Sequence, residues 1–367
     1  MAQKELFDKP FDEGTITKLE IFEKYFEKWL PTFLISDKIK KPIQVFDLFA
    51  GKGYDNNKTP GSPIRIINII NKHRENIQKY RKQIILFFND ADKDKVSALK
   101  SNVEEEVNKL SLDPLISIKF NSITFKQCLT EYKNELLNGC NLIFIDQNGF
   151  KEVTKSIFHI LANLDMTDFI FFISSTHIRR FAKSSEIQNI HPDFDFEGII
   201  NTPISQIHNK ICEEYKKYIP GNLVDCYLIP FSIMKEERKN IYGTIFVSKH
   251  ILAADKYLST VWEKNVLNGE ANFDINDDTQ LQLVNKLTKI EAFQKDLRRS
   301  ILDGKIKTNI DAYLFTIKKG HLPSHAYEEI KRMKDEKLIN YERKSPLVNY
   351  NSFKNNVIVD YNLIKNE

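Results

Sequence analysis

The residues whose types and spacing best suit chemistry lie in the segment VFDLFAGKG, residues 45–53. An apolar run leads directly into Asp47, and Gly51 and Gly53 follow two residues apart. Glycine has no Cβ, so the backbone at these positions can pass close to a bound ligand. A G-x-G pair is also typical of an ordinary sharp turn between a strand and a helix. The motif therefore predicts a ligand-binding turn only if other parts of the chain support it.

The apolar run at residues 84–88 leads into two acidic residues, Asp90 and Asp92. A carboxylate at the end of such a strand can accept hydrogen bonds from both hydroxyls of a ribose. The alternative for either residue is capping of the helix that follows, because aspartate is a favoured N-cap residue. This position therefore predicts a ribose contact or a helix cap.

Two more apolar runs lead into polar side chains in the same way. Residues 116–120 precede Asn121, which would lie at the edge of an adenine ring, and residues 142–145 precede Asp146. Open α/β sheets bind ligands in the crevice beyond the carboxyl ends of their strands. The residues at these four strand ends are therefore predicted to share one site, and they are Asp47, Gly51, Asp90, Asn121 and Asp146.

A sheet is needed to bring these residues together, and the order of apolar and amphipathic segments predicts one. Five apolar runs have the length of buried strands: residues 43–46, 84–88, 116–120, 142–145 and 169–173. Helices that cross over between parallel strands are expected near residues 63–79, 93–109, 125–137 and 151–163. The alternation predicts a doubly wound α/β sheet.

Further elements precede, interrupt and follow this alternation. An amphipathic helix is predicted over residues 17–34, within an N-terminal segment 1–37. Its apolar positions are Leu19, Phe22, Phe26 and Leu30. The sheet domain is expected over residues 38–265, with a polar insertion or lid near 179–221. Residues 222–248 read as two strands around a charged turn, which predicts a β-hairpin.

The C-terminal part of the chain is basic and helical in pattern. Residues 282–367 carry 17 Lys and Arg against 11 Asp and Glu. A helix is expected over residues 322–338 with Ser324 as its cap. Two alternating segments follow, 339–344 and 357–361, on either side of a polar turn. A helix followed by a two-stranded wing predicts a winged-helix-like domain over 282–367.

Local basic clusters are candidates for contacts with an anionic substrate. In the C-terminal part, the candidate phosphate contacts are Arg298, Arg299, Lys305 and Lys307. Arg179 and Arg180, just beyond the fifth strand, could steer an anion toward the predicted site. The alternative for both groups is a solvated surface.

Composition and missing motifs exclude several classes. The 367 residues predict roughly two to three domains. The longest strongly apolar run, residues 169–178, is far shorter than the roughly 20 residues that span a bilayer. The first 14 residues, MAQKELFDKPFDEG, are charged and have no apolar core, so a cytoplasmic protein is predicted. The four cysteines are widely spaced and read as reduced thiols. No P-loop, GxSxG or HExxH motif occurs, and the pair His321 and His325 alone makes no zinc site, so no metal is expected.

The motifs, taken in order, resemble the three-Cys-motif partner protein family (TcmP). The likeness rests on DLFAGKG, GSP at residues 61–63, NDAD, FIDQNG and ISSTHIRRF, and it extends to WEKN near Trp262 and to HLPSHAYEEIKRM. The resemblance implies an S-adenosylmethionine-dependent methyltransferase fold with a C-terminal winged-helix-like region. It also implies a radical-SAM-like three-Cys protein as partner. The hairpin that closes the predicted sheet is likewise methyltransferase-like.

The resemblance also implies roles for individual residues. The cofactor loop corresponds to Asp47, Phe49, Gly51 and Gly53. Asp90 corresponds to the ribose-binding acid, and Asp146 to the motif at the fourth strand. The family usually reads Asp-Pro-aromatic-Gly at that strand, whereas this chain has Gln147 and Asn148 between Asp146 and Gly149. Gln147 and Asn148 can form hydrogen bonds, but they cannot stack on a base.

Three functional hypotheses remain open from the sequence. The first is a methyltransferase in which Asp146 orients or deprotonates the acceptor and the basic C-terminal region delivers a nucleic-acid or protein substrate. The second is an adaptor that binds nucleic acid or a protein partner and has a decayed cofactor site, which the missing Asp-Pro-aromatic turn motivates. The third is a hydrolase that uses clustered carboxylates around magnesium. Its candidate ligands are Asp90, Asp92, Asp94 and Asp146.

Overall fold

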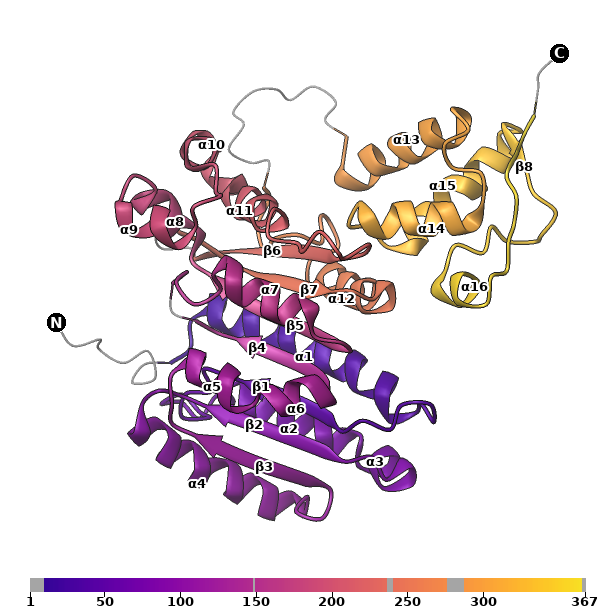
Figure 1. Ribbon diagram of the computed structural model, residues 1–367. Helices are drawn as coiled ribbons and strands as arrows, with labels where there is room; N and C mark the ends of the chain where they lie inside the picture. The colour runs from indigo at the N-terminus through magenta and orange to yellow at the C-terminus, as the bar shows by residue number, and fades with distance from the viewer. Residues whose placement is uncertain (1–9, 148, 236–239, 276–286, 365–367) are drawn as a thin grey trace. The chain divides into compact units, whose positions relative to one another are not determined.

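The computed structural model describes residues 10–147, 149–235, 240–275 and 287–364 (Figure 1). The chain divides into two compact units, Met1–Ala253 and Ala254–Glu367. In the described residues, no helix combines the length and apolar character needed to cross a bilayer. All four cysteines are free thiols, and burial raises the pKa of each.

The first unit is built on a seven-stranded sheet in the order β3-β2-β1-β4-β5-β7-β6. The strands are β1 (Ile43–Asp47), β2 (Ile84–Asn89), β3 (Ile116–Asn121), β4 (Cys140–Ile145), β5 (Thr167–Ile173), β6 (Tyr227–Lys235) and β7 (Asn240–Ser248). The first five are parallel, and β7 lies antiparallel between β5 and β6. This confirms the predicted doubly wound α/β sheet and the hairpin that closes it.

Helices cover both faces of the sheet (Figure 1). One face carries α1 (Glu13–Leu34), α2 (Ser62–Lys72), α3 (Arg74–Tyr80) and α4 (Lys93–Leu110). The other carries α5 (Phe125–Glu131), α6 (Lys133–Asn138), α7 (Lys155–Asn163) and α11 (Ile207–Lys216). Two of the predicted helices are each divided in two, at His73 and at Tyr132. The Tyr132 ring packs on Phe87 with 4.8 Å between centroids, and this tertiary contact accompanies the break.

Helix α1 confirms the predicted amphipathic helix and begins earlier, at an Asp12 side chain that accepts a hydrogen bond from the Thr15 N–H at 2.8 Å. All four predicted apolar positions are buried. The helix is also held by polar contacts that the sequence did not reveal. Tyr25 Oη and Trp29 Nε1 donate to Asp168 Oδ2 of β5 at 2.8 and 2.9 Å. These bonds satisfy a buried carboxylate and orient α1 along the sheet.

The segment expected as a polar insertion consists of short helices. They are α8 (Ser175–Phe181), α9 (Ser185–Ile190), α10 (Phe196–Asn201) and α11, with a 3₁₀ turn at Ile204–Gln206. Buried His208 of α11 joins two neighbours: Nδ1 lies 2.8 Å from Ser175 Oγ and Nε2 lies 3.1 Å from Thr244 O of β7. Both groups are fully buried, so this serine–histidine pair is a structural clamp.

The second unit contains α12 from Ala254 on (Ile251–Lys264), α13 (Lys289–Leu302), α14 (Asn309–Lys318), α15 (Pro323–Asp335), β8 (Ile339–Asn340), α16 (Tyr350–Lys354) and β9 (Asn362–Leu363). The predicted helix over 322–338 is confirmed as α15, but Leu322 occupies the cap position and Pro323 the first turn, so Ser324 is not the cap.

The strand pairing of this unit also differs from the prediction, because β8 pairs with residues 362–363 and not with 357–361. Val359 hydrogen-bonds instead to buried Asn309. The side-chain Oδ1 of Asn309 accepts from Val359 N at 2.7 Å, and the backbone N–H of Asn309 donates to Val359 O at 3.1 Å. A buried amide group needs hydrogen-bond partners, and the Asn309 amide oxygen bonds to the backbone of Val359 in the segment that the sequence pattern predicted as a strand.

The clamp around His208 generates a stability prediction. A Cβ added at Gly243 would lie 2.3 Å from His208 Nε2, whereas one added at Gly221 meets nothing within 4 Å. Gly243→Ala is therefore expected to lower the free energy of unfolding by about 1–3 kcal/mol through overpacking. Gly221→Ala is the matched control and should change it little. Urea denaturation followed by circular dichroism measures both, and equal stabilities would contradict the clamp.

Candidate active site

The candidate site lies at the carboxyl ends of β1 and β4, where the strand order reverses direction along the chain. Asp47 is in register with Phe144, so both side chains point to the face that α1 covers. Asp146, two residues after Phe144, points to the same face. Burial is the main cause that raises the pKa of Asp47, and the nearby carboxylates of Asp146 and Asp90 add to it, so the structure brings together three predicted residues.

Asp47 is a fully buried carboxylate that is only partly satisfied. Its Oδ1 accepts from Phe49 N at 3.4 Å, and in the described residues its Oδ2 has no hydrogen-bond partner. Burial raises the pKa of Asp47 to about 7, and the Ser62 side chain and the Phe49 amide offset this only in part. A buried, unpaired carboxylate oxygen costs stability and is a marker of functional sites.

In the loop after β1, both glycines adopt backbone conformations that favour glycine, as the motif predicted. Gly51 and Gly53 have φ values of 62° and 87°, which L-residues with side chains rarely adopt. Gly51 N donates to Asp90 Oδ2 at 3.2 Å, which joins the loop to the end of β2. Gly61 N, at the start of α2, donates to Gly53 O at 2.8 Å. These two hydrogen bonds connect the loop to the end of β2 and to the start of α2.

The acidic pair after β2 divides into two roles. Asp92 caps α4, because its side chain accepts from the amides of Asp94 and Lys95. Asp90 Oδ1 accepts from Asp92 N at 3.0 Å, and Oδ2 faces Gly51. Capping is thus confirmed for Asp92, and Asp90 is the acid that faces the loop. The sequence analysis missed buried Asn89, which donates to Leu48 O and Ile123 O and so ties the ends of neighbouring strands.

Asn121 and Phe49 lie at the same edge with neighbours of their own. Asn121 Nδ2 donates to Glu131 Oε1 of α5 at 2.8 Å. The Phe49 ring lies 5.7 Å from the ring of Phe125, the first residue of α5. These contacts provide an apolar and amide-lined surface between the ends of β1 and β3.

Asp146 has a partner that the sequence analysis missed, the ammonium group of Lys18. Lys18 Nζ lies 2.5 Å from Asp146 Oδ2, and the two side chains are 6% and 23% exposed. The signal was a lysine one helical turn before Phe22 in the buried stripe of α1. Gln147 is buried and engaged within the protein, since Nε2 donates to Phe172 O and Oε1 accepts from Glu152 N. Asn148 lies outside the described residues.

The predicted basic residues lie in both units. Arg179 donates to Ile200 O at 3.0 Å, and Arg180 is exposed on α8. In the second unit, Arg298 pairs with Glu329 and, through both terminal nitrogens, with Glu336. Its guanidinium group is therefore used within the unit. Arg299, Lys305 and Lys307 are exposed there, and the first two lie near Asp303.

Among the residues that the structure describes, no group of three or more His, Cys, Asp or Glu side chains could hold a metal ion. His321 and His325 contact each other, with 3.3 Å between their Nδ1 atoms, and both are buried near Trp262. Burial lowers the pKa of His321 to about 2 and that of His325 to about 4, so both belong to an apolar cluster.

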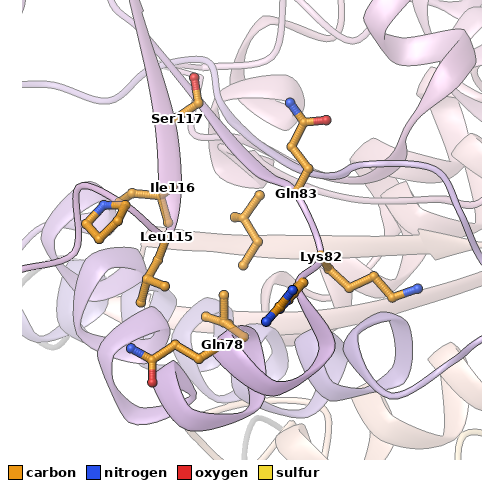
Figure 2. A pocket seen from close by; sticks show the side chains of 10 residues that line it. Gln78, Lys82, Gln83, Leu115, Ile116 and Ser117 are labelled. Carbon is orange, nitrogen blue, oxygen red and sulfur yellow. The ribbon is translucent and has the colours of Figure 1, made fainter.

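A cavity of about 450 Å³ opens at the opposite edge of the sheet (Figure 2). It lies where β2 and β3 begin, and residues that line it include Gln78, Arg81, Lys82 and Ser117. Lys82 is already engaged with the carbonyls of Ser36 and Ile39. The cavity is therefore separate from the predicted site, because parallel strands carry their two ends at opposite edges.

Comparisons with known proteins show distant likeness. No protein-family model matches the chain, and no curated protein matches it. Similar solved structures include the carbon methyltransferase DszA, at 10% identity and a TM-score of 0.38, over 65% of this chain and 55% of that chain. An O-methyltransferase from Bacillus cereus in complex with SAH matches at 12% identity and 0.33, over 65% and 91%. The plantazolicin methyltransferase BpumL with SAH matches at 10% and 0.31, over 65% and 88%. The chain thus spans about half the length of the first of these.

The buried Asp47 carboxylate leads to a prediction that asparagine substitutions at two aspartates change the free energy of unfolding in opposite directions. Asp47 loses its proton near pH 4 when unfolded but near pH 7 when folded, so the folded state binds more protons between these values. Stability therefore falls as pH rises through this window. Asp47→Asn removes the ionised form and is expected to raise the free energy of unfolding by about 2 kcal/mol at pH 8, and much less at pH 4.

Asp55 supplies the matched comparison, because it accepts hydrogen bonds from the amides of Phe11, Asn57 and Thr59, and these bonds hold its pKa below the usual value. Asp55→Asn should therefore lower stability at pH 8 by about 1–3 kcal/mol. Denaturant titrations at pH 4 and pH 8 measure both variants. The same sign for both at pH 8 would refute the assignment.

Proposed function

We propose that the protein binds S-adenosylmethionine at the ends of β1 and β2 and transfers its methyl group. The observation that carries the proposal is the buried Asp47 carboxylate, one oxygen of which has no hydrogen-bond partner among the described residues, next to a glycine turn at the strand-order reversal. A carboxylate oxygen of this kind suits the ammonium group of an amino-acid moiety. Asp90 suits the ribose hydroxyls, and the surface of Phe49 and Asn121 suits the adenine. The donor set therefore fits this cofactor.

When bound, S-adenosylmethionine supplies a methyl group that passes from sulfur to the acceptor and leaves SAH. The contribution of the protein is to bind and orient both molecules, which accounts for much of the rate in such reactions. Asp146 follows the end of β4, the strand next to β1, and we assign it the role of orienting the methyl acceptor. Its Oδ2 is held by Lys18, and in the described residues its Oδ1 has no hydrogen-bond partner, so Oδ1 can accept from an amine or hydroxyl.

Cofactor binding is tested by calorimetry with S-adenosylmethionine. Asp90→Ala removes the ribose acceptor and is expected to weaken binding by about 1–3 kcal/mol, or roughly fivefold to 150-fold in Kd. Asp92→Ala is the control, because Asp92 caps α4 on the same loop without facing Gly51. Equal affinities of the wild type and the Asp90 variant would remove Asp90 from the site.

We further propose a nucleic acid as the acceptor, delivered by the exposed basic residues of the second unit. Arg299, Lys305 and Lys307 support this because they cluster around the end of α13 and the start of α14. The TcmP relationship, the winged-helix character of this unit and the three-Cys partner are parts of the same proposal. The adaptor hypothesis shares the nucleic-acid surface, and Gln147 favours it in one respect, because its amide group is engaged by the backbone of Phe172 in β5 and of Glu152.

Filter binding of a 20-nucleotide RNA and DNA tests the surface. Replacing Arg299, Lys305 and Lys307 by alanine should weaken binding and reduce its salt dependence, since fewer counterions are released. A triple alanine variant of Lys72, Lys100 and Lys109 is the control, because these exposed residues lie in the first unit and its charge change is equal. Loss of binding in the control as well would indicate a nonspecific charge effect. Methyl transfer from labelled cofactor to the bound strand then separates an enzyme from an adaptor.

A further inference from the structure

Lys18 lies on the buried face of α1, where most of the other side chains are apolar. Lys18, Phe22, Tyr25 and Trp29 follow one another at spacings of four, three and four, so they form one line along the helix. The other three are aromatic and pack against the sheet, as Phe22 does on Phe144 at 4.3 Å between centroids. Lys18 is also buried, and it ends this line beside the candidate site.

The ammonium group is held by an ion pair and an aromatic ring. Besides its 2.5 Å contact with Asp146, Nζ lies 4.5 Å from the centroid of the Phe172 ring of β5. The Phe172 ring in turn stacks on Tyr242 of β7, with 5.8 Å between centroids. These neighbours fix the position of the charge, since a cation above an aromatic face is attracted by the ring.

Stability alone does not explain this pair. A buried ion pair pays a large desolvation cost, and replacing such a pair with apolar side chains is often neutral or stabilising. A methionine at position 18 would continue the apolar line of α1. A buried charge at the end of the helix, against the candidate acceptor residue, therefore indicates a role in the site.

The charges at this edge explain what that role is. Asp47, Asp90 and Asp146 lie close enough that the second and third raise the pKa of the first. These carboxylates together would bind a cationic sulfonium much more strongly than the neutral sulfur of SAH. Such a preference stabilises the donor before reaction and weakens as the sulfur charge decreases in the transition state, so it slows methyl transfer.

We propose that Lys18 is a positioning residue that clamps Asp146 and neutralises its charge, and thereby sets how strongly the site prefers the cationic methyl donor over its neutral product. The inference rests on the proposed function, because it concerns the same site. Lys18 holds Asp146 Oδ2 and leaves Oδ1 to the acceptor. Because of this ion pair, the Asp146 carboxylate stays oriented toward the acceptor but attracts the positive charge of the sulfonium less strongly.

The test compares the affinities for S-adenosylmethionine and SAH by calorimetry at one pH and one ionic strength. Lys18→Met leaves Asp146 unneutralised and is expected to increase the preference for S-adenosylmethionine over SAH by about three- to tenfold. Asp146→Asn leaves Lys18 unneutralised and should decrease the preference by a similar factor. Lys18→Arg keeps the charge and should retain the wild-type ratio.

The control is Lys72→Met, which removes one lysine charge from an exposed pair with Glu27. A ratio that stays constant in both site variants, while the wild type binds both ligands, would overturn the role of Lys18 and leave the proposed function intact. Absence of binding of either ligand to the wild type would overturn the proposed function and this inference with it. Thermal melting identifies a variant that fails to fold. If Lys18→Met does so, Asp146→Asn carries the test in the opposite direction.

Discussion

The packing of α1 across the sheet is the interaction on which the first unit depends. The parallel strands β4 and β5 and the antiparallel β7 present Phe144, Asp168 and Phe246 on one face, and α1 covers all three. Two of these contacts are ring contacts, and the third is a buried carboxylate that accepts from Tyr25 and Trp29. Because that carboxylate needs both donors, the helix can settle in one rotation and one position along the strands. The same rotation places Lys18 at the carboxyl edge of the sheet.

The carboxyl edge combines groups that the fold holds at a cost. Asp47 keeps a buried oxygen that has no partner in the part of the chain that the structure describes, Gly51 and Gly53 adopt positive φ, and Lys18 is a cation in an apolar row. The Asp47 carboxylate and the Lys18 ammonium each reduce stability relative to an apolar side chain, whereas glycine is the residue that adopts a positive φ without strain. All four residues occur within one small region. By contrast, Asp55 and Asn89 satisfy backbone groups in the surrounding loops. The edge is therefore a strained set of charges supported by well-satisfied loops.

Two pairs of residues show why residue type alone does not establish function. Ser175 and His208 have the chemistry of a nucleophile and its base, but both are fully buried and His208 bonds to a backbone carbonyl. His321 and His325 have the chemistry of metal ligands, but they pack in an aromatic cluster where burial keeps them neutral. In both pairs, exclusion of water and solutes decides the role. The candidate site differs, since Asp146 is partly exposed.

The sheet and the positions of the residues at its edge can be predicted from the amino-acid pattern alone. The five parallel strands appear as apolar runs, and polar residues at their ends must meet because parallel strands end at one edge. The edge strand β3 differs from the prediction of a buried strand, because its residues alternate between half-buried and exposed along its first four positions. The sequence could not show that Asp92 caps a helix while Asp90 faces Gly51, because both follow the same strand. Nor could it find Lys18, whose partner is 128 residues away. The wing pairing was mispredicted for a related reason, since Asn309 takes the backbone of Val359 through a contact between distant segments. Local patterns record the burial and periodicity of each segment, whereas the pairing of charges and amides between segments is decided when the helices and strands pack together.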